Sequence, residues 1–405
     1  MTDIPQPAAS RDIPDLKGWI SLTAASLTAV VVGFASTILL IMEAASAVGA
    51  TPSQKASWAA ALCFGMAISS LILSWRYRMP IITAWSTPGA ALIATGAAGV
   101  DYRGALGAFV LAGLLVCLTA LVTPVARLIE KIPAPIASAM LAGVLLRYVT
   151  GVPAAALALP LLVLPLVLGF FVLRLLVPLY AVPVLVAAGL VMAGLSGSFG
   201  AGCCTIGITT LEWTTPQFNP AAMLGLGVPL YLVTMASQNL PGFAVLRAAG
   251  YKPPVTGALW VTGLASLAAA PFGSHSINLA AITASIVTGP DCHPDPAKRW
   301  YMAWPYAIFY ILVGFAAVSF VAVLGALPAA IITAIAGLAL FAPLMGGVAA
   351  MTKDADGLEP ALVTFLITAS GLTLGGIGSA FWGLVGGLLL FAGRHALAGK
   401  MPRGR

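Results

Sequence analysis

Polar side chains that can donate hydrogen bonds interrupt an otherwise apolar stretch at residues 270–289. His275 and Ser276 follow a proline and a glycine, and Asn278 comes two residues later. Proline and glycine disfavour helix, so the first third of the stretch should be irregular. The pattern from Ile277 onward predicts a helix, with Ser276 or Ser274 as its N-cap. A helix that starts in mid-membrane presents free N–H groups and its positive dipole end, which suits the binding of an anion.

Residues 81–96 show the same arrangement earlier in the chain. Ile81–Ser86 should be extended or irregular, Thr87 is a natural N-cap, and Pro88 takes the first helical position, where its missing N–H costs nothing. Two interrupted segments in corresponding positions of two halves are a strong indication of a transporter's substrate site. The two stretches therefore predict these binding residues: Ser86, Thr87, Pro88, Gly89, His275, Ser276 and Asn278.

Glu43 is the one acid among twelve that we place inside a predicted span. A buried carboxylate is costly unless it is paired or protonated, so Glu43 is a functional candidate. Burial favours the neutral form of a carboxyl group, which suits a proton carrier. The alternative is a protonated structural acid bonded to a neighbouring helix. His275 is the rival carrier, because histidine changes its charge near neutral pH; its own alternative is a structural role.

The elements that hold these residues are membrane spans. Of the 405 residues, 60% are hydrophobic and 8% are charged, and the mean hydropathy is +1.03, as in polytopic membrane proteins. The polar residues 1–18 do not resemble a cleavable signal. Windows of about 20 apolar residues predict an all-α protein with fourteen spans, at residues 22–48, 56–75, 80–98, 104–122, 134–150, 158–173, 177–194, 221–241, 254–270, 271–289, 301–324, 328–351, 359–376 and 379–395.

The basic residues predict the orientation of these spans. With the N-terminus in the cytoplasm, 16 of the 19 Lys and Arg residues fall in cytoplasmic segments, and only Lys55, Arg103 and Arg147 lie outside. This matches the positive-inside rule and places both termini in the cytoplasm. The asymmetry explains the net charge of +7, so we expect no nucleic-acid partner. The five cysteines lack metal-ligand spacing, and we expect no metal or cofactor.

A faint internal repeat divides the spans into two halves of seven. Pro133-Ala-Pro-Ile136 opens the fifth span and Pro328-Ala-Ala-Ile331 opens the twelfth, 195 residues later. An odd number of spans per repeat makes the second half inverted, with the broken third and tenth spans as partners. The predicted organisation is a cytoplasmic tail at 1–21, repeats at 22–194 and 221–395, an external loop at 195–220, and a tail at 396–405.

The same offset relates Glu43 to Gln238 in the eighth span. Gln238 and the adjacent Asn239 are candidate substrate ligands, although they could equally bond neighbouring helices. Candidate walls for an aromatic ring are Trp85, Phe272, Tyr231 and Met235, with Tyr231 also among the predicted substrate-binding residues. Aromatic residues in spans more often pack or anchor at interfaces.

Several of these motifs resemble the benzoate/proton symporter family of bacteria. They are Trp85-Ser-Thr-Pro-Gly-Ala-Ala-Leu92, Gly33-Phe-Ala-Ser36 before Glu43, and Ala139-Met-Leu-Ala-Gly143. The resemblance covers essentially the whole chain. It implies a fold similar to the nucleobase and sulfate transporters, with a core unit of spans 1–4 and 8–11, a gate unit of spans 5–7 and 12–14, and substrate between them. It also implies a bacterial inner-membrane location.

The nucleobase relatives carry acids where this sequence has Gln238 and His275. A nucleobase presents N–H donors and needs acceptors, whereas a carboxylate needs donors. The leading interpretation is therefore import of benzoate or a similar aromatic carboxylate with a proton. The alternatives are transport of a nucleobase or an inorganic anion, and an anion channel of the same fold. We find no nucleophile–base pair that would indicate an enzyme. A homo-oligomer is compatible with the sequence, which does not fix the oligomeric state.

Overall fold

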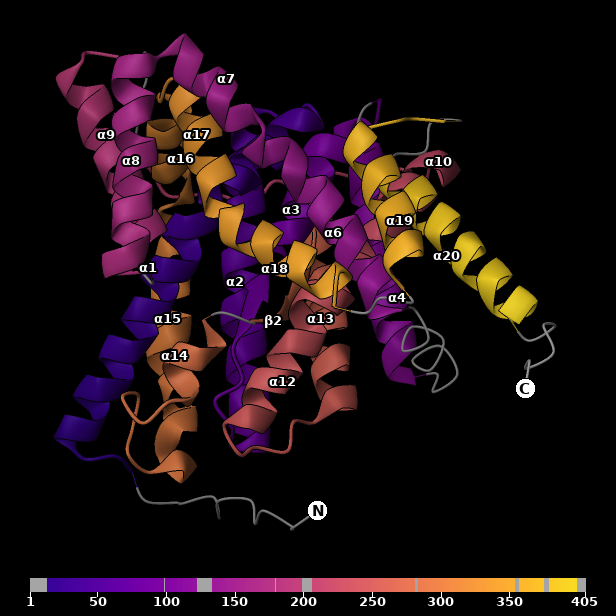
Figure 1. Cartoon of the computed structure of the whole chain (residues 1–405). Helices are drawn as coiled ribbons and strands as arrows, with labels where there is room; N and C mark the ends of the chain where they lie inside the picture. Colours follow the sequence, from indigo (N-terminus) through magenta and orange to yellow (C-terminus); the bar gives the residue numbers. More distant parts are fainter. Residues whose placement is uncertain are drawn as a thin grey trace.

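Apolar helices make up most of the structure (Figure 1). The computed structural model describes residues 13–97, 99–121, 133–178, 180–198, 206–280, 283–353, 357–374 and 379–398. The first half contains α1 (Leu16–Ala47), α2 (Pro52–Tyr77), β1 (Thr83–Trp85), α3 (Thr87–Gly96), α4 (Tyr102–Leu121), α6 (Ala134–Val149), α7 (Gly151–Ala158), α8 (Pro160–Leu176) and α9 (Ala181–Leu195).

The second half begins with a helix that is interrupted by two π-helical segments. Its parts are α10 (Pro220–Ala222), the π-helical segment η1 (Met223–Gly227), α11 (Val228–Thr234), a second π-helical segment η2 (Met235–Asn239) and α12 (Leu240–Ala248). The remaining elements are α13 (Val255–Ala269), η3 (Ala270–Phe272), β2 (Ile277–Leu279), α14 (Ala284–Thr288), η4 (Pro296–Met302), α15 (Ala303–Phe315), α16 (Ala317–Gly325), α17 (Ala329–Ala339), α18 (Phe341–Met351), α19 (Leu358–Ser370) and α20 (Ser379–Ala398).

The lengths of these helices define a polytopic membrane protein. In the described part of the chain, seven helical stretches are long and apolar enough to span, and α15 with α16, bent by 58°, would make an eighth. Four further apolar helices are shorter: α8, α9, α19 and α20. The two longest helices, α1 and α2, start at side-chain caps. Asp15 caps α1, and Thr51 forms a capping box with Gln54 at the start of α2.

Two short strands, each next to a short helix, meet inside the bundle. β1 and β2 pair antiparallel, with Thr83 opposite Leu279 and Trp85 opposite Ile277. β1 leads into α3 at Ser86, one residue before the predicted cap. The predicted helix from Ile277 is wrong, because Ile277–Leu279 is strand and the helix that follows begins only at Ala284. Tertiary hydrogen bonds explain the difference, since Ser266 of α13 bonds both the N–H and the carbonyl of Ile277.

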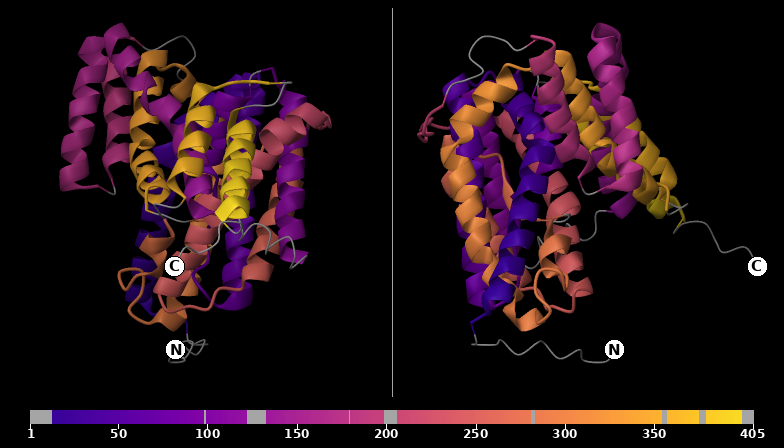
Figure 2. Two further views of the ribbon diagram at one scale, coloured as in Figure 1. Left: turned by 45° about the vertical axis from the view of Figure 1, so that its right-hand side comes forward. Right: turned by 90° about the vertical axis from the view of Figure 1, so that its left-hand side faces the viewer.

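The heaviest packing contacts fall into two groups of helices. In the first, α2 packs on α13 and α15, α4 on α13, and α1 on α3 and α15. In the second, α6 packs on α18 and α19, α17 on α7 and α8, and α19 on α20. The two groups meet where α3 packs on α6 and where α1 packs on α9 and α17. Figure 2 shows α19 and α20, in yellow, side by side in both views. Gly387 makes this pairing close, because a Cβ there would lie 3.0 Å from the carbonyl oxygen of Pro360 in α19.

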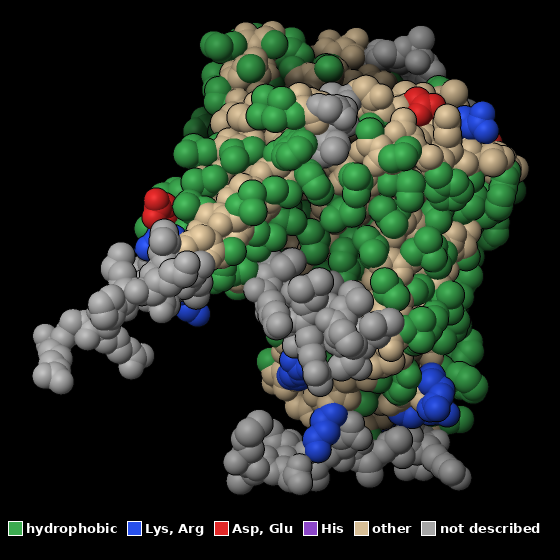
Figure 3. Space-filling model, turned by 90° about the vertical axis from the view of Figure 1, so that its right-hand side faces the viewer, with side chains coloured by type: hydrophobic (Ala, Val, Ile, Leu, Met, Phe, Trp, Pro, Cys, Tyr) green, Lys and Arg blue, Asp and Glu red, His purple; other side chains and the backbone are tan. Residues whose placement is uncertain are grey.

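The surface carries a broad apolar belt. Figure 3 shows hydrophobic side chains over the upper and middle parts of one face, while Lys and Arg side chains gather toward the lower end. The chain enters α1 at that lower end (Figure 1). An apolar belt is what a protein in a lipid bilayer requires.

Candidate functional site

A small cavity lies where β1 turns into α3. Its volume is about 80 Å³, several times the ~10–15 Å³ that one buried water needs. The lining residues come from α1, α2, β1, α3, η2, α15 and the segment before α14. They are Val32, Gly33, Thr37, Met66, Ala84, Trp85, Thr87, Gln238, Thr283 and Tyr310. None of these described residues is acidic, so the polar groups facing the cavity are hydroxyls and an amide.

The start of α3 gives this cavity its electrostatic character. Ser86 caps the helix by accepting a 3.0 Å hydrogen bond from the N–H of Gly89 through its side chain. Pro88 has no N–H, so Thr87 is the first-turn residue whose N–H is left without a helical partner. Thr87 lines the cavity and is half-buried. The cavity therefore receives a free N–H group at the positive end of a ten-residue helix.

Trp85 forms an aromatic wall that is fixed from α1. Its indole N–H donates a 2.7 Å hydrogen bond to the Thr37 hydroxyl, which in turn donates to the carbonyl of Gly33 at 2.9 Å. Phe34 and Tyr310 meet the Trp85 ring edge-on, with centroids 5.9 and 6.4 Å away. Gly33 allows Tyr310 to approach α1 closely, because a Cβ at position 33 would lie 3.0 Å from the Tyr310 hydroxyl.

His275, just before β2, bonds to Ser86 and so connects the β2 segment to the start of α3. Its Nδ1 accepts a 3.2 Å hydrogen bond from the Trp58 indole N–H, which can only donate. Nε2 is therefore the protonated nitrogen, and it donates to the carbonyl of Ser86 at 3.0 Å. The side chain is 1% exposed and does not line the cavity. These two bonds require a neutral imidazole that carries its proton on Nε2.

Four other predicted binding residues form hydrogen bonds within the protein, three of them in or around β2 and the fourth, Tyr231, between α11 and α4. Asn239 accepts the N–H of Leu279 at 2.9 Å, which attaches η2 to the strand. Asn278 is fully buried and donates to the carbonyl of Leu279 at 3.0 Å. Ser276 donates to the amide oxygen of Asn278 at 3.4 Å, and Tyr231 shares a hydrogen bond with the hydroxyl of Thr119. None of the four lines the 80 Å³ cavity.

Gln238 does line the cavity, next to the scaffold residue Asn239. Both belong to the π-helical segment η2, whose wider turn aims neighbouring side chains at different partners. The sequence offset had related Gln238 to Glu43, but the two residues line different cavities. Thr37, rather than Glu43, is the α1 residue with a polar side chain that faces the same cavity as Gln238.

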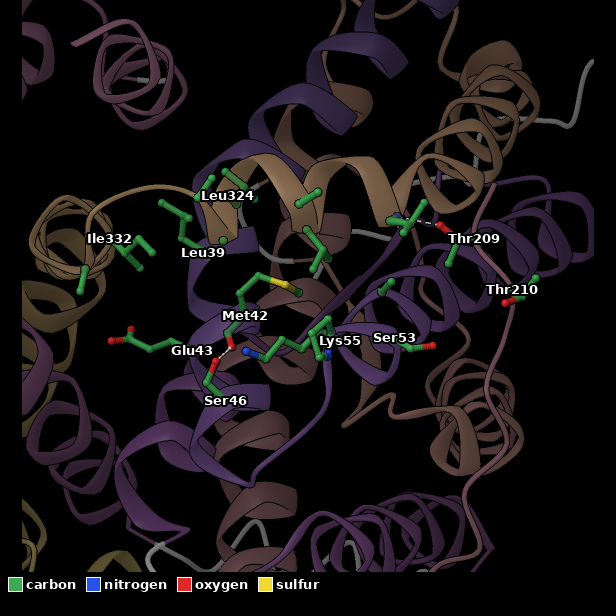
Figure 4. A pocket seen from close by; sticks show the side chains of 18 of the residues that line it. Leu39, Met42, Glu43, Ser46, Ser53, Lys55, Thr209, Thr210, Leu324 and Ile332 are labelled. Atoms are coloured by element: carbon green, nitrogen blue, oxygen red, sulfur yellow. Dashed lines mark hydrogen bonds between the residues drawn. The ribbon is translucent and has the colours of Figure 1, made fainter. Parts of the chain in front are cut away.

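Glu43 lies six residues beyond Thr37, about 9 Å further along α1 at 1.5 Å per residue. It lines two other cavities near the end of that helix, with volumes of about 720 and 440 Å³. One carboxyl oxygen of Glu43 is buried and has no hydrogen-bond partner. Figure 4 shows the carboxyl group directed away from Lys55, toward the helix that carries Ile332.

The predicted site thus divides into residues that face the cavity and residues that support it. Thr87, Gln238 and the candidate wall Trp85 line the cavity, and Ser86, Pro88 and Gly89 shape the helix start beside it. Phe272 and Met235 do not line it. The sequence analysis missed Thr37, Thr283 and Tyr310. The signal for Thr37 was its place directly after the Gly33–Ser36 motif; isolated hydroxyls elsewhere in apolar spans gave none.

The fold is shared with two solved structures of anion transporters. The transmembrane domain of the cyanobacterial bicarbonate transporter BicA superposes with a TM-score of 0.59 at 13% sequence identity, covering 93% of this chain and 98% of that one. The inward-facing structure of the murine anion transporter Slc26a9 gives a TM-score of 0.63 at 14% identity, covering 97% of this chain and 70% of that one. At these identities the likeness establishes the fold.

The sequence then identifies the family. Residues 19–392 match the family described as benzoate membrane transport protein, to which this chain belongs. Inner membrane protein YdcO of Escherichia coli is 39% identical over 376 residues, covering 93% of this chain and 96% of that protein. The benzoate membrane transport protein of Acinetobacter baylyi is 32% identical over 372 residues, covering 92% and 94%. The chain is a multi-pass membrane transporter and not an enzyme.

Proposed function

We propose that this protein imports benzoate or a similar aromatic carboxylate together with a proton, by alternating access. The observation that carries the proposal is the cavity at the start of α3. It offers the N–H and hydroxyl of Thr87, the amide of Gln238 and the hydroxyl of Thr283 beside the ring of Trp85. A carboxylate needs donors, and an aromatic ring needs an apolar wall. The benzoate transporter of A. baylyi, similar over nearly its whole length, supports this substrate class.

The walls favour an aromatic carboxylate over the other substrates considered. Val32, Met66 and Trp85 present apolar surface that a hydrated inorganic anion would not use. A nucleobase would require acceptors for its ring N–H groups, and the described lining contains no carboxylate. Benzoate matches both the donors and the apolar walls.

The moving units in this proposal are the two helix groups. The core unit would comprise α1–α4 with the elements from α10 to α16, and the gate unit α6–α9 with α17–α20. The concentration of the heaviest packing contacts within these two groups supports this division. The order of the elements supports a count of fourteen spans in which β1–α3 and β2–α14 are the broken third and tenth. The basic side chains at the lower end support an inner-membrane orientation with both termini in the cytoplasm (Figure 3).

The test is uptake of labelled benzoate into proteoliposomes. An imposed inward proton gradient should drive accumulation above that in protein-free liposomes, which are essential because neutral benzoic acid crosses bilayers unaided. One proton per anion is electroneutral, so an imposed membrane potential should leave accumulation unchanged. An anion channel would instead respond by about 2.3 kcal/mol per 100 mV, roughly a fifty-fold change in the accumulation ratio. That response would reject symport.

A further inference from the structure

The largest described cavity that involves Glu43 is separate from the substrate cavity. It has a volume of about 720 Å³ and lies between the end of α1, the start of α2, the segment at 208–210 and the helices α16 and α17. Most of its wall is apolar, including Leu39, Val321 and Ile332. Cavities of roughly 300–1,000 Å³ with few polar groups are typical of small-molecule sites. In the proposed orientation this cavity faces the outside.

Lys55 provides the single positive charge in this wall. In the part of the chain that the structure describes, its ammonium group has no hydrogen-bond or ion-pair partner. Figure 4 shows the Lys55 side chain running along the cavity toward Ser46, while the carboxyl group of Glu43 points the other way. Lys55 is only partly exposed. A partly buried cation without a counter-ion is costly, and a bound anion would remove that cost.

The neighbouring cavity has a cation that is already engaged. Arg147 lines the 440 Å³ cavity on the other side of Glu43, and its guanidinium donates to the carbonyl of Thr95 at 2.9 Å. Lys55 is therefore the charged group that remains free to bind a ligand. The orphaned oxygen of Glu43 between the two cavities fits a neutral carboxyl group, which would not compete for Lys55.

We propose that the 720 Å³ cavity is an outer binding site for the aromatic carboxylate, in which Lys55 holds the carboxylate and the apolar wall receives the ring. The site would capture substrate before it reaches the cavity at α3. This inference rests on the proposed function and adds a second, outer site to it. Partly desolvated charge pairs and charge-assisted hydrogen bonds are strong enough to matter at low substrate concentration.

The experiment measures initial rates of benzoate uptake into proteoliposomes against external benzoate concentration. Lys55→Met should raise KM about tenfold while Vmax stays within about twofold, which corresponds to the loss of one charge-assisted contact. Lys55→Arg should restore most of the affinity. Raising the salt concentration should raise KM of the wild type but not of Lys55→Met, because screening acts only where the charge is present. Lys353→Met, at an exposed lysine outside both cavities, is the matched control.

A second variant keeps the test independent of the lysine itself. Ser53→Asp places a carboxylate on an exposed residue of the same wall, in the first turn of α2, where an acid favours the helix. It should also raise KM. Wild-type KM in both Lys55→Met and Ser53→Asp would overturn the outer site. Absence of benzoate uptake by the wild-type protein would instead reject the proposed function.

Discussion

The imidazole of His275 donates a 3.0 Å hydrogen bond to the carbonyl of Ser86, across 189 residues of sequence. Ser86 caps α3 through its side chain, and its backbone carbonyl accepts both the N–H of Ala90 in the first turn of the helix, at 2.8 Å, and this bond from His275. The other ring nitrogen accepts from Trp58 of α2. The side chain of His275 thereby connects the start of α3 to the segment before β2 and to α2.

We predict that His275→Ala destabilises the protein rather than uncoupling it. The substitution leaves the Trp58 N–H buried without a partner, removes one of the two hydrogen bonds to the Ser86 carbonyl and opens a cavity, for a cost of about 2–5 kcal/mol. Thermal unfolding in detergent should show a clear drop in Tm. Trp58→Phe, which removes only one of the two bonds, should give a smaller drop. A His275→Ala protein of normal Tm that had lost gradient-driven uptake would restore histidine as the proton carrier.

Thr87→Val should weaken benzoate binding in the substrate cavity. The change keeps the shape of the side chain and removes a hydroxyl that faces the cavity, so a loss of about 1–2 kcal/mol, or roughly five- to thirty-fold in affinity, is expected. Gln238→Leu should have a similar effect. Equilibrium binding of labelled benzoate measures both. Thr364→Val is the matched control, since that hydroxyl bonds the carbonyl of Pro360 in its own helix; equal affinity in all variants would remove Thr87 and Gln238 from the site.

Local sequence signals were sufficient at the first broken segment and insufficient at the second. At Thr87-Pro88 the proline itself fixes the start of α3, so the prediction missed the cap by only one residue. At Ile277 the local pattern favoured helix. The strand forms because β1, Ser266 and Asn239 supply its hydrogen bonds from elsewhere in the chain. No local pattern contains that information.

The same limit separates the residues of the site from its scaffold. His275, Asn278 and Asn239 were predicted as ligands because polar residues in a span suggest function, and in this structure each forms a hydrogen bond within the protein and lies outside the cavity lining. Thr37 and Thr283 were missed because a single hydroxyl in an apolar helix usually bonds its own backbone. The residues that line the cavity come from seven elements, so only the packed structure distinguishes them from the scaffold residues.

Cys292 should be inert to thiol reagents in the folded protein. It lies in the loop after α14, fully buried, and burial raises the pKa of its thiol to about 12, with Arg299 opposing the shift. The reactive thiolate is therefore almost absent at pH 7–8. Peptide mapping after maleimide treatment should show Cys292 unmodified in the native protein and modified once detergent and urea unfold it. Rapid labelling at pH 7 in the native state would contradict this packing.

Glu43 is our choice for the coupled proton because of where α1 places it. It borders both outer cavities, where it can exchange a proton with the outside, and it lies about two turns of helix from the substrate cavity. Its orphaned buried oxygen fits a protonated carboxyl group. A mono-anion entering against an inside-negative potential is opposed by about 2.3 kcal/mol per 100 mV, and one accompanying proton cancels that cost.

Glu43→Gln should therefore separate binding from coupling. Glutamine keeps the shape and neutrality of the protonated acid but cannot release a proton, so the variant should bind benzoate and exchange it across the membrane at equal pH. It should fail to concentrate benzoate when a pH gradient is imposed. Glu359→Gln, at an exposed acid paired with Arg394 in α20, is the matched control and should accumulate normally. Gradient-driven accumulation by Glu43→Gln at the wild-type level would show that another group carries the proton.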